Sequence, residues 1–216
     1  MTEIYRRDDV SVDQQHALAS AARSLAEEFS GTFDAETIDR FLHSSFEQFA
    51  GRASVPHSLP LLAERFARQR LHALARVEGT TGTPIVLFLC VHNAGRSQMA
   101  LGFFNHLAGD GAIGWSGGSA PRDQINPAAV EAMRERGIDI TGEYPKPWTT
   151  EIVQAADVIV TMGCGDACPV FPGRRYLDWS LDDPADQGVA AVRRIRDEIE
   201  QRVRGLLADL EVPVRA

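Results

Sequence analysis

The chain has 216 residues, of which 44% are hydrophobic and 24% are charged, as is typical of a globular α/β domain with a small additional module. Its net charge of −8 argues against a general binder of nucleic acid or of anionic membranes, because such proteins present a basic face. No apolar run approaches the roughly 18 residues of a membrane span, and the first residues lack the apolar core of a secretion signal. We therefore expect a cytoplasmic protein that binds neither nucleic acid nor membrane.

Helical periodicity alone fills residues 1–79, which we expect to form a separate domain. Ser11 and Gln14 have the spacing of a capping box at the start of a first helix. Asp34 is expected to cap a second helix and Ser58 a third. Three short amphipathic helices predict a small three-helix bundle, which we interpret as a scaffold or docking module.

Strands and helices alternate in residues 80–216, which we expect to form the second domain. A turn-rich linker at 78–84 precedes the first strand of this domain. The alternation predicts an α/β fold with a doubly wound parallel sheet of four strands. We expect strands at 85–89, 113–116, 156–161 and 175–178, and helices at 97–107, 126–137, 150–155 and 188–210.

A cysteine and an arginine stand at the two ends of the segment that joins the first strand to the next helix. Between Cys90 and Arg96, successive backbone N–H groups can point inward as an anion nest, and the helix that follows adds its positive end. The guanidinium of Arg96 can pair with two oxygens of a tetrahedral oxyanion. The same donors stabilise a cysteine thiolate, so Cys90 is expected to act as a nucleophile. The residues expected to surround the oxyanion are Val91, His92, Asn93, Ala94, Gly95, Arg96 and Ser97.

Four residues of this segment carry further expectations. Ser97 is placed to hydrogen-bond the cysteine sulfur. Asn93 and Gly95 suit a loop that turns tightly or takes positive φ. His92 raises the alternative of a Cys–His pair, but we interpret it as a loop residue whose backbone matters more than its ring.

The other two of the three cysteines follow the strand expected at 156–161, on the same edge of the sheet. Cys164 and Cys168 are four residues apart in a glycine-containing loop, so they can form a disulfide if the loop folds back. A zinc site is an alternative, although only two ligands are local, and two inert buried thiols are another. We favour a redox role close to Cys90.

An acidic pair follows the last expected strand. Asp183, next to Pro184, is expected to protonate a leaving oxygen as general acid, and Asp182 is the other candidate. A plain Asp-Pro turn is the alternative reading of the pair.

Three segments together, 90–97, 162–169 and 182–184, resemble the thiol-dependent arsenate reductases that have the fold of low-molecular-weight tyrosine phosphatases. The resemblance extends over residues 84–212. The helical module of residues 1–79 resembles an extension found in some actinobacterial relatives.

The resemblance implies a role for each matched residue. Cys90, Arg96 and Asp183 correspond to the nucleophile, the anion clamp and the acid, and Cys164 and Cys168 to two resolving thiols, which are usually farther apart. Leu101 stands where some members have an acidic residue of a potassium site, so we expect no such site. We also expect no other metal and no cofactor.

The function implied by the resemblance is reduction of arsenate to arsenite, with phosphate or sulfate as mimics of the substrate and thioredoxin as the electron donor. One alternative is a low-molecular-weight tyrosine phosphatase, which would leave Cys164 and Cys168 idle; residues 179–187 also lack the aromatic residues that normally follow Asp-Pro in such enzymes. A second is a reductase that uses mycothiol or glutathione, which needs one cysteine. A third is a non-catalytic protein that binds trivalent arsenic through three thiols. For the helical module, we consider docking of the electron donor or of a second subunit in a homodimer.

Overall fold

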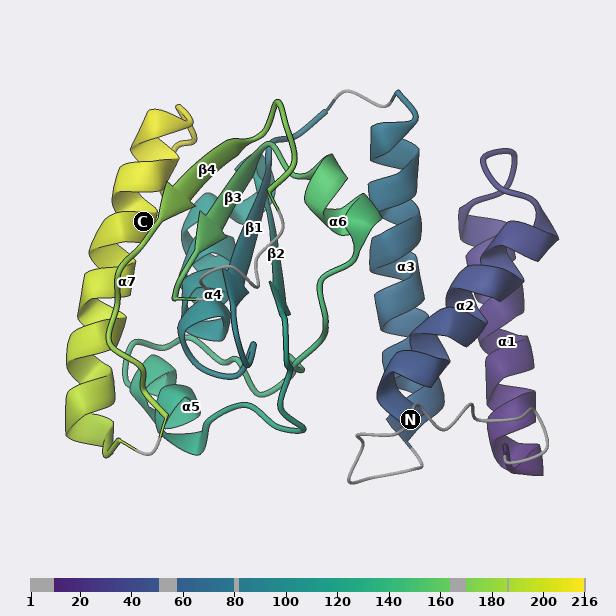
Figure 1. Cartoon of the computed structure of the whole chain (residues 1–216), viewed down its shortest axis with the longest axis horizontal. Coiled ribbons are helices and arrows are strands. Elements are labelled where there is room, and N and C mark those ends of the chain that lie inside the picture. The colour runs from purple at the N-terminus through teal and green to yellow at the C-terminus, as the bar shows by residue number, and fades with distance from the viewer. Residues whose placement is uncertain (1–9, 51–57, 80–81, 164–169, 186, 216) are drawn as a thin grey trace. The chain divides into compact units, whose positions relative to one another are not determined.

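The computed structural model describes residues 10–50, 58–79, 82–163, 170–185 and 187–215. The chain forms two compact units, Met1–Thr80 and Thr81–Ala216. The predicted fold class is confirmed: three helices precede a unit with a parallel four-stranded sheet (Figure 1). None of the described helices is long and apolar enough to cross a membrane.

The first unit consists of helices α1 (Val12–Glu28), α2 (Ala35–Ala50) and α3 (Leu59–Val77). The predicted capping box at the start of α1 is present, with hydrogen bonds in both directions between Ser11 and Gln14. Asp34 also caps as predicted, because its Oδ1 accepts a hydrogen bond from the Thr37 backbone over 2.8 Å. The core of the unit contains the fully buried Leu25, Leu42, Phe66 and Leu71.

The predicted cap of the third helix is wrong. Ser58 precedes α3, but its side chain makes no capping hydrogen bond. Its backbone has φ −86° and ψ −9°, a helical conformation, whereas a capping serine adopts an extended one. Pro60 also removes an N–H group that such a cap would bind.

The second unit is built on a sheet with the strand order β2-β1-β3-β4, in which all neighbours are parallel. The apolar run of β1 is buried along its whole length because it is a central strand. Helices α7 and α6 lie on opposite sides of the sheet (Figure 1). The elements in chain order are β1 (Ile85–Cys90), α4 (Arg96–Ala108), a short 3₁₀ helix (Gly109–Gly111), β2 (Ile113–Gly118), α5 (Pro127–Arg134), α6 (Thr150–Ala155), β3 (Val158–Thr161), β4 (Arg175–Asp178) and α7 (Val189–Asp209).

Three predicted boundaries shift by two or three residues, and one of them is the end of β2, which lies at Gly118 rather than at residue 116. Helix α5 ends at Arg134 rather than at Gly137, which has φ +72° in the turn that follows. The Ile138 backbone donates back to the Met133 carbonyl over 3.1 Å, the bond of a helix end that requires a left-handed residue. Strand β3 begins two residues later than expected because Ala156 is the cap residue that ends α6.

The register of the sheet brings the ends of its strands to one edge. Cys90 pairs with Gly118, the last residue of β2, and Thr161 at the end of β3 pairs with Asp178 at the end of β4. The segments that follow all four strands therefore start from the same edge, where open α/β sheets bind their ligands.

Candidate active site

The sulfur of Cys90 lies at the end of β1 and forms two hydrogen bonds. The Asn93 backbone N–H donates to Sγ over 3.2 Å, and the Ser97 hydroxyl lies 3.0 Å from it, as expected from the sequence. The Asn93 side-chain amide donates to Ser97 Oγ over 2.9 Å. Since that bond occupies a lone pair of the oxygen, the hydroxyl proton is free to point at the sulfur. Both groups can therefore donate to the Cys90 sulfur.

Asn93 is the left-handed residue of the loop, with φ +46°, and is completely buried. Its Oδ1 accepts hydrogen bonds from the Lys146 backbone over 2.9 Å and from Gln98 Nε2 over 3.2 Å. These two donors fix the amide so that its nitrogen faces Ser97. Asn93 therefore fulfils the expectation of positive φ, whereas Gly95 has φ −129° and needs another explanation.

The carbonyl groups of the loop point away from the sulfur. Those of Val91, His92 and Ala94 accept hydrogen bonds of 2.8–3.0 Å from residues of the segment that follows β2. The Asn93 carbonyl accepts one from Gln98 Nε2 over 3.0 Å. Because a trans peptide directs its N–H opposite to its C=O, the N–H groups that follow these carbonyls, those of residues 92 to 95, point inward. The N–H of Asn93 points inward because it donates to the Cys90 sulfur. The four N–H groups together form an anion nest.

Arg96, the first residue of α4, is buried and paired with Asp183. Its Nη2 donates to Asp183 Oδ2 over 2.9 Å and its Nη1 to the Leu181 carbonyl over 3.3 Å. The other carboxylate oxygen of Asp183 accepts from the Ala185 backbone over 2.9 Å. The arginine expected to clamp the anion thus holds the carboxylate expected to act as acid.

The Asp-Pro segment is fixed over the cysteine loop by close packing. A Cβ atom on Gly95 would lie 2.7 Å from Pro184 Cγ, so a glycine is needed here for the approach of the proline rather than for its φ. Asn126 Nδ2 donates to the Pro184 carbonyl over 3.1 Å, and Gln187 Nε2 to the Asp183 carbonyl over 2.7 Å. Asp182 is exposed and does not line the pocket, which favours Asp183 of the two candidate acids.

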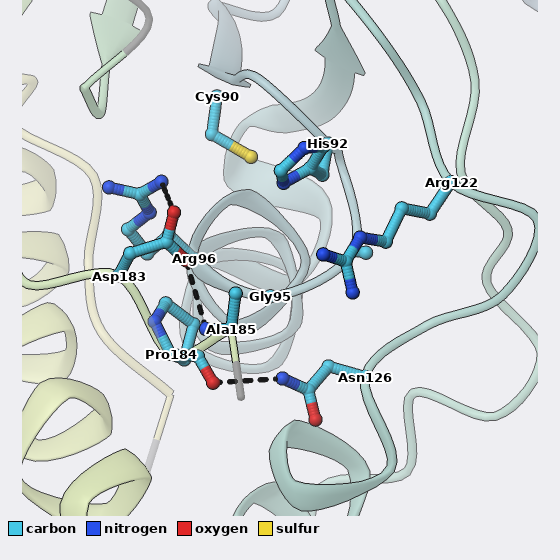
Figure 2. Close-up of a pocket in the computed structure, with 10 residues that line it drawn as sticks. Cys90, His92, Gly95, Arg96, Arg122, Asn126, Asp183, Pro184 and Ala185 are labelled. Atoms are coloured by element: carbon cyan, nitrogen blue, oxygen red, sulfur yellow. Dashed lines mark hydrogen bonds and ion pairs between the residues drawn. The ribbon is translucent and has the colours of Figure 1, made fainter. Parts of the chain in front are cut away.

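A single pocket brings these residues together (Figure 2). The sulfur of Cys90 points into it, and Arg96 and Asp183 lie at one side. Its lining consists of Cys90, His92, Ala94, Gly95, Arg96, Arg122, Asn126, Asp183, Pro184 and Ala185.

Residues 85–215 match the family described as low molecular weight phosphotyrosine protein phosphatase. The chain belongs to this family. Residues 18–75 match a second family, the N-terminal domain of protein-tyrosine-phosphatase-like proteins, which corresponds to the helical unit.

Several proteins to which this chain is similar are named arsenate reductases. A thioredoxin-dependent arsenate reductase of Corynebacterium glutamicum superposes with a TM-score of 0.82 and 42% identity, covering 92% of this chain and 98% of its own. The arsenate reductase of Bacillus subtilis is 38% identical over 130 residues, 56% of this chain and 92% of its own. A solved arsenate reductase in a phosphate-binding state has a TM-score of 0.52 and 31% identity, over 59% of this chain and 98% of its own.

Arg122 and Asn126 line the pocket of this phosphatase-like unit but were missed as site residues from the sequence. Both lie after β2, the neighbour of β1 in the parallel sheet. The pairing of β1 with β2 brings these two residues close to Cys90, and such a pairing of distant segments cannot be read from the local sequence pattern. Asn126 was recognised as the start of α5, where its side chain does cap the Ala128 backbone over 2.9 Å.

The predicted resolving thiols, Cys164 and Cys168, lie outside the described residues. The last residue described before them is Gly163, which has φ +71°. A Cβ atom on Gly163 would lie 2.8 Å from Arg96 Nη1. Gly163 itself therefore lies next to the guanidinium of the pocket arginine.

Proposed function

We propose that this protein reduces arsenate to arsenite, with Cys90 as the nucleophile. The observation that carries the proposal is the sulfur of Cys90, which forms two hydrogen bonds at the base of a nest of inward N–H groups. Arsenate is a tetrahedral oxyanion of the kind that such a nest binds. The 42% identity over 92% of the chain to a thioredoxin-dependent arsenate reductase supports this substrate over other oxyanions.

The first step joins sulfur to arsenic. Arsenate binds the inward N–H groups and Arg96, and the Cys90 thiolate attacks the arsenic atom. One As–O bond breaks as the S–As bond forms, and Asp183 delivers the proton with which the departing oxygen leaves as water. The hydrogen bond from Arg96 keeps the Asp183 carboxyl group next to the residue proposed to bind the anion.

The reduction itself takes place in the next step. The Cys164 thiolate attacks Cys90 Sγ, and the electron pair of the S–As bond stays on arsenic, which leaves as arsenite. Cys168 then attacks the sulfur of Cys164 in the new Cys90–Cys164 disulfide and releases the Cys90 thiolate. The remaining Cys164–Cys168 disulfide is reduced by an external dithiol, for which we propose thioredoxin.

The reductase is tested by arsenate-dependent oxidation of NADPH in the presence of thioredoxin and thioredoxin reductase. Cys90→Ser should abolish turnover, and Cys164→Ser and Cys168→Ser should each stop it after at most one cycle. Mass spectrometry of the oxidised wild type should find a Cys164–Cys168 disulfide. Wild-type rates in both of the latter variants would refute the relay.

A tyrosine phosphatase is the second candidate, because the family match and the group of Cys90, Arg96 and Asp183 fit phosphoester hydrolysis equally well. It gives Cys164 and Cys168 no task. Hydrolysis of an aryl phosphate much faster than arsenate reduction would favour it. Stoichiometric binding of arsenite without any turnover would instead favour a non-catalytic arsenic-binding protein.

We propose that the chain has two domains, a helical domain of residues 1–79 and a catalytic domain of residues 80–216. We also propose that the helical domain docks thioredoxin or a second subunit. Matches of the two parts to separate families support this division. Deletion of residues 1–79 should raise KM for thioredoxin or dissociate a dimer, with little change in KM for arsenate. An unchanged truncated protein would reduce the module to a stabilising element.

A further inference from the structure

Arg122 extends into the active-site pocket from the side opposite to Arg96 and Asp183 (Figure 2). It follows β2, and its backbone N–H donates to the His92 carbonyl over 3.0 Å. That bond anchors the start of the side chain to the cysteine loop itself. The position of Arg122 is therefore fixed relative to Cys90 by the same contacts that turn the loop carbonyls outward.

The two arginines of the pocket differ in what they bind. The Arg96 guanidinium is paired with Asp183, so that part of its charge is already neutralised. The Arg122 guanidinium makes no ion pair or hydrogen bond within the described part of the chain. An exposed arginine without a partner that lines an anion pocket is available to the ligand.

The direction of attack defines which oxygen faces Arg122. In an in-line displacement the leaving oxygen lies opposite the attacking atom. An anion held by the inward N–H groups and Arg96 would direct three oxygens toward them and its leaving oxygen away from Cys90. Asp183 and Arg122 lie on opposite sides of the pocket (Figure 2).

We propose that Arg122 binds the outward-facing oxygen of the oxyanion and thereby selects free arsenate over organic esters. In an ester this oxygen carries the organic group and is a poor acceptor, so the arginine gains little from such a ligand. Its donor also stabilises the oxygen that leaves when the S–As bond forms. The arsenate part of this inference rests on the proposed function, whereas the contact with the outward oxygen does not.

The test compares two probes that differ at the outward position. Inorganic phosphate has an oxygen there, and phenylphosphonate has a phenyl carbon. Calorimetric titration of the reduced full-length protein gives the dissociation constant of each probe for the wild type and for Arg122→Gln. The matched control is Arg194→Gln, since Arg194 is an exposed arginine of α7 outside the pocket.

Arg122→Gln should weaken phosphate binding about tenfold, the loss expected for one charge-assisted hydrogen bond at a partly exposed site. It should change phenylphosphonate binding less than about twofold, because the outward acceptor is absent there. Arg194→Gln should change neither. Equal weakening of both probes, or no change in either, would overturn the assignment. Neither titration uses arsenate or thioredoxin, so failure of the reductase proposal would not be confused with failure of this one.

Discussion

Arg96 and Asp183 form an ion pair across 87 residues of sequence, with Arg96 Nη2 donating to Asp183 Oδ2 over 2.9 Å. The arginine side chain is 7% exposed and the carboxylate 48%, so the pair runs from the buried wall of the pocket to its rim. An oxyanion that binds Arg96 must therefore share the guanidinium with Asp183. The pair couples substrate affinity to the position of the proposed acid.

This coupling predicts opposite effects of Asp183→Asn on binding and on turnover. The asparagine can keep the turn to Ala185 but loses the charge that competes for Arg96, so phosphate should bind about threefold more tightly. The proposed proton donor is lost, so kcat for arsenate should fall at least about 100-fold. Calorimetry and the thioredoxin-coupled assay measure the two effects.

Asp182→Asn is the matched control, because Asp182 is the exposed neighbour outside the pocket. It should leave both phosphate affinity and kcat unchanged. A fall in kcat for the Asp182 variant and not for the Asp183 variant would reverse the choice of acid.

Gly95→Ala is predicted to displace the Asp-Pro segment. The new Cβ would lie 2.7 Å from Pro184 Cγ, well inside contact distance, so Pro184 and with it Asp183 must move. We expect kcat/KM for arsenate to fall by at least about tenfold, since a small displacement of a catalytic group is costly. Gly142→Ala is the control, because a Cβ there meets nothing within 4 Å. Equal activity of both variants would show that the contact of Gly95 with Pro184 is dispensable.

The cysteine loop could be predicted from the sequence because its information is local. Cys90 ends a strand, and Arg96 and Ser97 begin the helix that follows it, so their spacing alone indicates how they surround an anion. The α/β architecture followed for a similar reason, since each buried strand is a continuous apolar run.

The contacts between distant segments could not be predicted in this way. The Arg96–Asp183 pair and the place of Arg122 depend on which strands are neighbours and on how the loops after them cross the sheet edge. Local pattern also failed at Ser58, where a serine before a helix adopts a helical backbone instead of a capping one. The role of Gly95 was misjudged because the atom that demands a glycine, Pro184 Cγ, belongs to a distant segment.

Ser97→Ala should make Cys90 less reactive. The hydroxyl lies 3.0 Å from the sulfur, and without it one of two donors to the thiolate is lost. We expect the rate of alkylation of Cys90 by iodoacetamide at neutral pH to fall about tenfold, the loss of one charge-assisted hydrogen bond. Ser119→Ala removes an exposed hydroxyl just after β2 and should have no effect. Equal rates in the wild type and the Ser97 variant would show that the backbone of Asn93 suffices.

The last prediction concerns the stability of the second unit and its dependence on pH. The hydrogen bond from Arg193, with a further one from Arg196, lowers the pKa of Glu135 from its ordinary 4.5 to about 2. Glu135 is the cap residue that follows α5, and both arginines belong to α7, so these ion pairs join the two helices. Folding therefore favours the charged carboxylate: its contribution to stability is complete above about pH 4.5 and is lost as the pH falls toward 2.

Glu135→Gln should accordingly lower the urea midpoint of unfolding at pH 7, and the difference from the wild type should narrow at about pH 3. Tryptophan fluorescence reports this unit alone, because Trp115, Trp148 and Trp179 are the three tryptophans of the chain. Glu131→Gln, which removes an exposed pair with Arg134 within α5, is the control and should shift the midpoint much less at pH 7. An equal loss of stability at both pH values would mean that Glu135 acts through packing or shape rather than through its charge.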